Sequence, residues 1–216
     1  MILALDIGTT GLKGALLEED GTPREVGERS LPLSSDISDP LRHETDAWEW
    51  VRRIRDLCTE FGLSSEMKPA AVAVSGNGPT LVPVGHDDRP LRPAMLWMDR
   101  RCVDEAAAIS EINGFYVDPT FYLPKALWFH SHEPEVYERT RYFFACPEYI
   151  TYLLTGRAAT VLPAVGFESY IWTEELVTQL GMEWSKFPDL VRPGEPMGVT
   201  TAVGSDLLGV PEGVPV

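Results

Sequence analysis

Asp6 and the turn that follows it are the residues of this chain best placed to do chemistry. The apolar run 2–5 ends in this single carboxylate and enters the turn Gly8-Thr9-Thr10-Gly11, and a second, largely apolar run follows at once. Two strands joined by this turn would bring Asp6 close to several backbone N–H groups with little side-chain bulk over them. Such N–H groups form an anion-binding concavity, glycine permits close approach, and a carboxylate can hold Mg²⁺ directly or through water. The turn therefore predicts a site for a polyphosphate and its cation.

An ordinary hairpin is the alternative interpretation of this turn. In that case the Asp-x-Gly sequence would only satisfy turn chemistry. Short glycine motifs occur in many unrelated proteins, so this segment alone leaves both interpretations open.

The overall charge limits the choice of partner. The 216 residues include 18 Lys and Arg against 33 Asp and Glu, a formal charge of −15. An anionic surface of this strength argues against nucleic acid or an acidic membrane as a partner. It does not exclude a phosphorylated ligand, because backbone N–H groups and Mg²⁺ can make a small site locally electropositive.

The sequence also carries indications of location. Its apolar runs are too short to span a bilayer, and Asp6 interrupts the stretch that a signal peptide would need. Cys58, Cys102 and Cys146 are odd in number and widely spaced, as is typical of reduced thiols. We therefore expect a cytoplasmic protein.

The expected elements follow the order of an α/β protein. Apolar residues at three- and four-residue spacing predict a helix over 46–61, with Thr45 as its N-cap. We expect strands over 2–6, 12–18, 23–33, 70–75, 80–84 and 94–97, a loop over 33–42, and helices over 103–112, 125–132, 135–139 and 146–155. The signals weaken beyond residue 161. Three meandering strands, a helix and a further strand match a ribonuclease-H-like, or actin-like, nucleotide-binding core.

Several segments, taken in order, resemble one family. They are Asp6-Ile7-Gly8-Thr9-Thr10-Gly11-Leu12-Lys13, Glu44-Thr45-Asp46-Ala47-Trp48, Ala73-Val74-Ser75-Gly76-Asn77-Gly78, Leu91-Arg92-Pro93-Ala94-Met95-Leu96-Trp97-Met98-Asp99-Arg100-Arg101, Leu123-Pro124-Lys125-Ala126-Leu127-Trp128 and Glu148-Tyr149-Ile150-Thr151-Tyr152-Leu153-Leu154-Thr155-Gly156. With these segments the chain resembles the N-terminal domain of the FGGY carbohydrate kinases, over nearly all 216 residues.

The resemblance implies a fold and an activity. The expected fold is an α/β, ribonuclease-H-like (actin-like ATPase) domain, with a mixed sheet flanked by helices and a mainly helical insertion after the fifth strand. Residues 1–216 would form the sugar-binding domain of an ATP- and Mg²⁺-dependent kinase that phosphorylates a hydroxyl of a sugar or polyol. The nucleotide-binding domain would lie outside this chain, and so would the general-base aspartate, expected beyond Val216. The chain alone should therefore be inactive.

The resemblance also assigns roles to residues. Asp6 would help to hold Mg²⁺, and the ATP phosphates would lie against Gly8, Thr9, Thr10 and Lys13. Lys13 is equally compatible with a solvated strand lysine.

A second group of residues would contact the sugar. It comprises Ser75, Asn77 and Gly78 from one loop, and Trp97 and Asp99 from a later segment. A carboxylate can accept hydrogen bonds from sugar hydroxyls, and an indole face can pack on a sugar ring. The alternatives are a core role for the tryptophan and a turn or cap role for the aspartate.

The chain departs from its relatives in the sugar loop. Xylulokinases typically carry Gln-Met-His there and glycerol kinases an Arg-Glu pair, whereas this chain has Asn77-Gly78-Pro79. Neither specificity can therefore be carried over. A non-catalytic sugar-binding or regulatory module, or another actin-like protein, remains an alternative, and a homodimer is left open.

Overall fold

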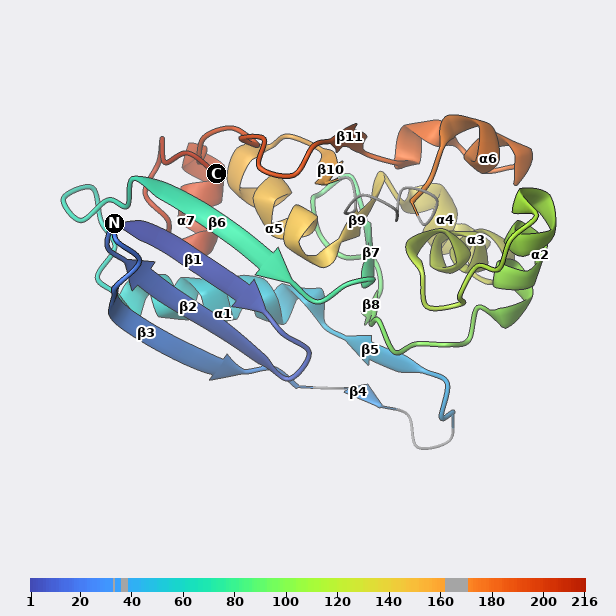
Figure 1. Ribbon diagram of the computed structural model, residues 1–216, viewed down its shortest axis with the longest axis horizontal. Helices are drawn as coiled ribbons and strands as arrows, with labels where there is room; N and C mark the ends of the chain where they lie inside the picture. Colours follow the sequence, from blue (N-terminus) through green and yellow to red (C-terminus); the bar gives the residue numbers. More distant parts are fainter. Residues whose placement is uncertain (33, 36–38, 162–170) are drawn as a thin grey trace.

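The computed structural model describes residues 1–32, 34–35, 39–161 and 171–216. The strands are β1 (Ile2–Ile7), β2 (Gly11–Leu17), β3 (Pro23–Ser30), β4 (Ser34–Ser35), β5 (His43–Thr45), β6 (Ala71–Gly76), β7 (Leu81–Val84), β8 (Ala94–Met95), β9 (Tyr142–Ala145), β10 (Ala159–Val161) and β11 (Asp189–Val191). The helices are α1 (Ala47–Glu60), α2 (Val103–Asn113), α3 (Tyr122–His132), α4 (Pro134–Arg139), α5 (Cys146–Thr155), α6 (Glu174–Gln179) and α7 (Ala202–Leu208), with a 3₁₀ turn, η2, at Trp184–Lys186. Figure 1 shows a sheet lobe at the left and a helical lobe at the right.

The first sheet has the strand order β3-β2-β1-β6, with β1 antiparallel to β2 and parallel to β6. Alternate residues of β1 point to opposite faces, so Leu3, Leu5 and Ile7 are buried while Asp6 is exposed. The predicted meander, helix and parallel strand are confirmed, since α1 lies between β3 and β6 in the chain.

A second sheet, of order β4-β5-β8-β7-β9, lies between the two lobes. The strands expected at 80–84 and 94–97 belong to this sheet, where Leu81 pairs with both Met95 and Ala145. The helices α2, α3, α4 and α6 form the helical lobe beyond it (Figure 1). This lobe corresponds to the helical insertion that we expected.

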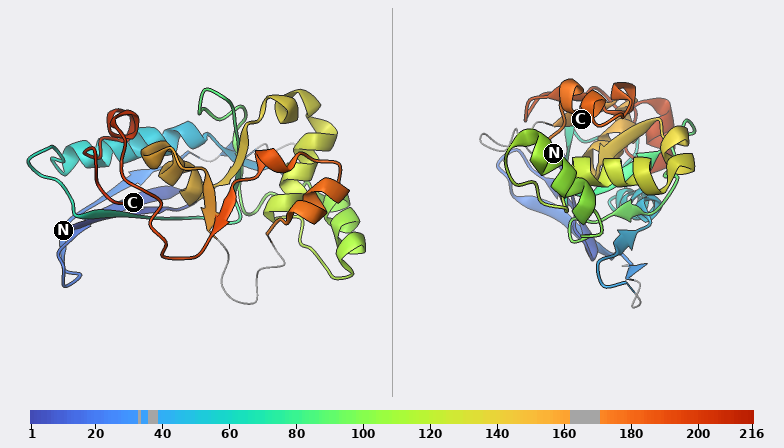
Figure 2. Two further views of the ribbon diagram at one scale, coloured as in Figure 1. Left: turned by 90° about the horizontal axis from the view of Figure 1, so that it is seen from above. Right: turned by 90° about the vertical axis from the view of Figure 1, so that its right-hand side faces the viewer.

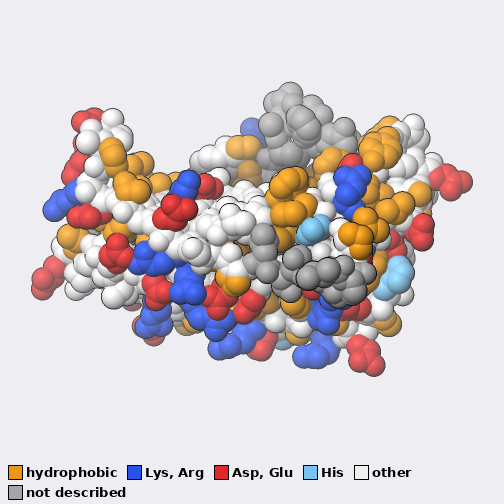
Figure 3. All heavy atoms as spheres, turned by 90° about the horizontal axis from the view of Figure 1, so that it is seen from below, with side chains coloured by type: hydrophobic (Ala, Val, Ile, Leu, Met, Phe, Trp, Pro, Cys, Tyr) orange, Lys and Arg blue, Asp and Glu red, His pale blue; other side chains and the backbone are white. Residues whose placement is uncertain are grey.

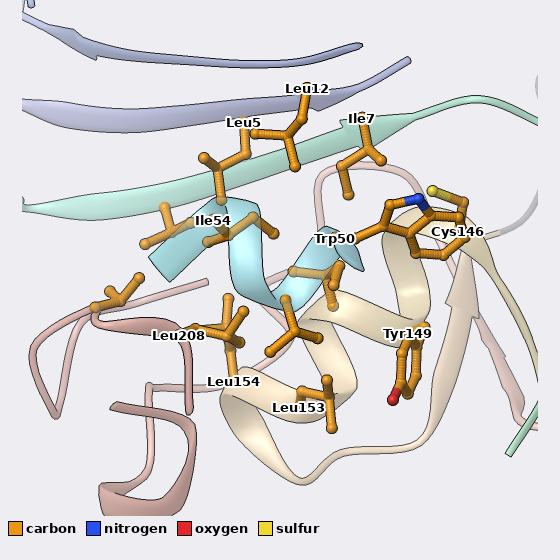
Figure 4. Packing of buried hydrophobic residues seen from close by; sticks show 14 of the residues in the cluster. Leu5, Ile7, Leu12, Trp50, Ile54, Cys146, Tyr149, Leu153, Leu154 and Leu208 are labelled. Carbon is orange, nitrogen blue, oxygen red and sulfur yellow. The ribbon is translucent and has the colours of Figure 1, made fainter. Parts of the chain in front are cut away.

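Helices α1, α5 and α7 cover one face of the first sheet, as the left view of Figure 2 shows. Figure 4 shows Leu5, Ile7 and Leu12 of the sheet facing Trp50 of α1, whose indole also lies beside Cys146 of α5. All five side chains are at most 2% exposed. Replacing a buried tryptophan such as Trp50 by alanine typically costs about 3–5 kcal/mol, which makes this layer the main anchor of the hairpin.

Three helix starts differ from the prediction, that of α4 by a single residue. Asp46, not Thr45, is the N-cap of α1: its side chain accepts a hydrogen bond from the Trp48 N–H at 2.9 Å. Thr45 instead lies in β5, and its hydroxyl donates to the Pro32 carbonyl. Helix α3 begins at Tyr122, because Pro124 fits within the first turn of a helix, where its missing N–H costs nothing. Lys125 is therefore the fourth residue of the helix, within its first turn.

None of the helices in the described parts of the chain combines the length and apolarity needed to cross a membrane. The three cysteines are free and buried.

Candidate functional site

The turn between β1 and β2 is closed by its own backbone. The Gly8 N–H donates to the Gly11 carbonyl at 2.9 Å, and Thr9 and Thr10 form the bend between them. A Cβ at Gly8 would lie 2.7 Å from the Gly11 carbonyl oxygen, closer than real Cβ atoms approach. Position 8 therefore needs glycine, and the backbone at the tip of the hairpin stays uncovered by a side chain there.

Asp6 stands in a polar row on the uncovered face of the first sheet. The strand register places it opposite Lys13 on one side and Ser75 on the other. All three side chains are exposed and line a groove of about 310 Å³. The groove floor includes Ala4 and Ala73, whose small side chains leave the carboxylate accessible. The hairpin thus presents Asp6 to an open groove and not to packed side chains.

Trp97 links the hairpin to the segment that follows β8. Its indole Nε1 donates a hydrogen bond to the Thr9 hydroxyl oxygen at 2.9 Å. The side chain is 45% exposed, so the core role left open by the sequence does not apply. Because the Thr9 oxygen accepts from the indole, its own proton is free to be donated elsewhere.

The loop after β6 is tied to the end of β1. The Asn77 backbone N–H and side-chain Nδ2 both donate to the Ile7 carbonyl, at 2.8 and 3.0 Å, and the Asn77 Oδ1 accepts from the Thr80 hydroxyl. Gly78 is exposed, and a Cβ there would lie 2.9 Å from the Tyr122 hydroxyl. The loop therefore places Asn77 beside the hairpin and brings an aromatic residue of α3 close to Gly78.

Asp99 does not fit the predicted role of a direct sugar ligand. It is fully buried, and its carboxylate accepts from the His43 N–H at 2.9 Å and from Arg101 Nε and Nη2 at 3.0 and 2.6 Å. Arg101 Nη2 also donates to Glu44 at 2.7 Å. These bonds enclose the carboxylate within protein, so the structural alternative of a turn residue describes Asp99 better.

Arg101 is the centre of this buried charged cluster, which we define as Glu44, Asp99 and Arg101. Burial lowers the pKa of its guanidinium, but the hydrogen bonds that it donates to both carboxylates more than offset this and raise that pKa above its usual range. The guanidinium also lies 4.9 Å from the ring centre of Trp128, within the range of a cation–π contact.

Sequence reasoning missed four residues of this region: Glu44, Arg101, Tyr122 and Lys125. One signal was visible for Lys125, which is a lone cation in the apolar stretch 121–129. Its side chain is fully buried and its Nζ donates to the carbonyls of Pro79 and Leu96, at 2.6 and 2.7 Å.

A larger cavity, of about 1140 Å³, runs along β6. Glu148, near the start of α5, lines it and is 6% exposed. Its Oε1 accepts from the Val161 N–H at 3.2 Å, whereas Oε2 has no partner among the described residues. Burial raises the pKa of this carboxyl to about 6.

The donor set at the hairpin fits a magnesium–polyphosphate ligand. No group of three His, Cys, Asp or Glu side chains converges anywhere in the described residues, and the carboxylates at the hairpin are those of Asp6 and, across Lys13, of Glu28. Mg²⁺ is usually held by one or two carboxylates together with phosphate oxygens and water. The glycine at position 8 keeps the hairpin backbone accessible to such a ligand.

The surface is consistent with a small anionic ligand at a local site. Figure 3 shows Lys and Arg side chains intermixed with Asp and Glu along the edge of one face, and hydrophobic side chains gathered over the helical lobe at the right. Neighbouring charges of opposite sign partly offset each other along this edge, although the chain as a whole carries a formal charge of −15.

The family model described as "FGGY family of carbohydrate kinases, N-terminal domain" matches residues 1–216. The chain therefore belongs to the FGGY family of carbohydrate kinases, as an N-terminal domain. Among curated relatives it is 29% identical to the xylulose kinase of Streptomyces coelicolor, with 92% of this chain and 44% of that protein covered. It is 27% identical to the xylulose kinase of Lactococcus lactis, with 93% and 43% covered.

Solved structures agree with this assignment. Xylulose kinase from Rhodospirillum rubrum superposes with a TM-score of 0.87 at 28% identity, covering 99% of this chain and 47% of that one. Glycerol kinase from Plasmodium falciparum, at 16% identity and a TM-score of 0.79, shares the fold alone, again over 99% and 47% of the two chains. The expected actin-like ATPase fold is thus confirmed. The chain spans a little under half the length of these proteins.

Proposed function

We propose that residues 1–216 are the sugar-binding domain of an ATP- and Mg²⁺-dependent kinase that phosphorylates a hydroxyl of a sugar or polyol. The nucleotide-binding domain and the general-base aspartate would lie beyond Val216, and no side chain of this chain is assigned as the base. The similar xylulose kinases are about twice as long as this chain, which supports this division. A cytoplasmic location stays a prediction from the three unpaired thiols.

The observation that carries the proposal is the hydrogen bond between Trp97 and Thr9. It joins the segment predicted to hold the sugar to the turn predicted to hold the phosphates. Phosphoryl transfer depends mostly on positioning the two reactants and neutralising charge. A site that brings these two segments into direct contact provides that positioning.

Each group of residues would then have a distinct task. The Asp6 carboxylate would help to hold Mg²⁺, which would neutralise charge on the ATP phosphates when bound, and the Thr9 hydroxyl would donate its free proton to a phosphate oxygen. The exposed Trp97 indole would pack on the apolar face of the sugar ring. The remaining N–H of the Asn77 amide could donate to a sugar hydroxyl, because its other groups are bonded to Ile7 and Thr80.

Calorimetric titration of the chain with pentoses, hexoses and polyols, beginning with D-xylulose, tests this proposal. We expect one sugar to bind, and we expect Trp97→Ala to weaken its affinity about tenfold, as the loss of an aromatic contact implies. Trp48→Ala is the matched control, since Trp48 is half-buried and lies against Arg89, 4.5 Å from ring centre to Cζ. Equal losses in both variants, or no binding of any sugar, would contradict the proposal.

The alternative of a non-catalytic sugar-binding module predicts the same titration. The two hypotheses differ in the role of the β1–β2 hairpin, because a module that only binds sugar would not need a phosphate site there. Titration with magnesium and inorganic triphosphate separates the two, because only the kinase predicts binding that requires Asp6.

A further inference from the structure

Lys125 is a buried cation that none of the proposed steps uses. It lies in the first turn of α3, is 0% exposed, and donates from Nζ to two backbone carbonyls. The Pro79 carbonyl belongs to the loop between β6 and β7, and the Leu96 carbonyl directly follows β8. A single ammonium group thus joins a helix to the loop that connects the two sheets and to the segment that follows β8.

Burial of this side chain carries an energetic cost. It lowers the pKa of the Lys125 ammonium to about 7, against the opposing influence of Cys102 and Asp99. Methionine would fill similar volume without that cost, so packing alone does not explain a lysine here. The distinctive contribution of the ammonium is its pair of short hydrogen bonds.

The two carbonyls stand next to the residues of the proposed sugar site. Pro79 follows Gly78 and lies two residues from Asn77, whose side chain is bonded to the end of β1. Leu96 directly precedes Trp97, whose indole is bonded to Thr9. Fixing the two carbonyls on one nitrogen atom therefore fixes the two loops relative to each other.

We infer that Lys125 is a positioning residue of the sugar site, which sets the spacing between the Asn77–Pro79 loop and the Trp97 segment. The effect on sugar binding rests on the proposed function. The effect on the position of Trp97 does not, because the ordering of its indole can be measured without any sugar.

Lys186 provides a matched control within the same chain. It is 7% exposed, and its Nζ donates to the Thr140 and Glu138 carbonyls at 2.9 and 3.4 Å. It lies in η2, beside Tyr137 and Glu183, and its bonds reach none of the predicted site residues. A purely structural role would make the two lysines behave alike.

The experiment compares Lys125→Met with Lys186→Met in the chain 1–216. Both should lower the thermal stability, since each removes an ammonium donor from two carbonyls, although the Leu96 carbonyl keeps its bond from the Asp99 N–H. Only Lys125→Met should raise the dissociation constant for D-xylulose, or for the sugar that binds in the panel, by about tenfold, because the two loops lose their shared donor. In ¹⁵N spectra, only this variant should speed the solvent exchange of the Trp97 indole N–H.

Two further variants keep the test decisive. If Lys125→Met does not fold, Lys125→Gln retains one donor group and should show a smaller effect in the same direction. Lys125→Ala should regain sugar affinity and indole protection when ethylamine is added, because the small ammonium can occupy the vacated space. Unchanged indole exchange in Lys125→Met, or equal changes in Lys186→Met, would overturn the inference. A wild-type chain that binds no sugar, with indole exchange that still depends on Lys125, would instead refute only the proposed function.

Discussion

Two groups of polar residues differ in how their charges are neutralised. One is the exposed row of Asp6, Lys13 and Ser75, and the other is the buried cluster of Glu44, Asp99 and Arg101. The row stands on an uncovered sheet face, with its polar groups open to a ligand. The buried cluster satisfies its charges internally, through bonds of 2.6 to 3.0 Å. The difference separates two tasks: the row is available for binding, whereas the cluster fixes the segments that present the neighbouring site residues.

This comparison predicts that substitutions in the buried cluster should reduce stability strongly, whereas substitutions in the exposed row should affect ligands and leave stability nearly unchanged. The first and last of the four measurements below test it directly, and the two between them extend it to one more buried and one more exposed polar group, in order of decreasing effect on the free energy of unfolding.

Arg101→Met should have the largest effect. It removes the guanidinium from two carboxylates, Asp99 at 0% and Glu44 at 6% exposure, of which Glu44 keeps only its bond from the Arg42 guanidinium at 3.0 Å. Removing one member of a buried ion pair typically costs about 3–5 kcal/mol. Urea unfolding measures this loss. Arg100→Met is the control, because Arg100 is half-exposed and pairs with Asp118 only at 3.6 Å. Similar losses for both would contradict the distinction.

Glu148→Gln should stabilise the chain at neutral pH. The folded-state pKa of this carboxyl is about 6, raised by burial from 4.5, so ionisation costs stability as pH rises through that interval. Above pH 6 the variant should exceed the wild type by up to about 2 kcal/mol, at about 1.4 kcal/mol per pKa unit. Below pH 4.5 the Glu148 carboxyl of the wild type is protonated in the folded and the unfolded state alike, so the difference in stability from the variant should vanish. Unfolding curves across this range measure it, and a gain independent of pH would contradict the assignment.

Thr9→Val removes the acceptor of the Trp97 indole. The expected loss of stability is about 0.5–1 kcal/mol, because the half-exposed indole N–H can bind water instead. Tryptophan fluorescence should shift to longer wavelength as the indole becomes hydrated. The neighbouring Thr10→Val is the control, since Thr10 is exposed and does not contact the indole through an equivalent bond. An unchanged spectrum for Thr9→Val would contradict the link between the two segments.

Asp6→Asn should change the free energy of unfolding by less than about 0.5 kcal/mol, as is usual for exposed positions. It should nevertheless weaken binding of magnesium triphosphate by about tenfold, through loss of a charged ligand. Asp20→Asn makes the same charge change in the exposed turn after β2, where the carboxylate accepts from Thr22. If Asp20→Asn weakened binding equally, the effect would be one of net charge and not of the site.

Local patterns were sufficient to predict the hairpin and most of the main elements. The alternation in β1 and the glycine-threonine turn determine which way Asp6 points, since both are contiguous in sequence. The predicted N-cap of α1 was wrong by one residue, because Thr45 and Asp46 are both good N-cap residues and only the strand pairing of Thr45 decides between them. The elements beyond residue 170 have only three to seven residues each, too few for a clear period.

The buried cluster could not be predicted in the same way. Glu44 and Arg101 are 57 positions apart and meet only because β5 pairs with β8 in the second sheet. The burial of Asp99 could not be predicted for this reason, since an aspartate next to two arginines does not reveal whether it faces solvent or a buried guanidinium. Lys125 was visible as a lone cation, but its two carbonyl partners lie 46 and 29 positions away.

The uncovered sheet face has a consequence for how separate copies of this domain behave in water. It carries Val26, 66% exposed, and Ile2, 38% exposed, beside small alanines. It is therefore an exposed apolar surface on a domain with a strong negative charge. Mutual repulsion between copies opposes their contact at low ionic strength. Added salt shortens the reach of that repulsion to about 10 Å at 0.1 M while leaving the apolar attraction intact, so self-association should increase with salt.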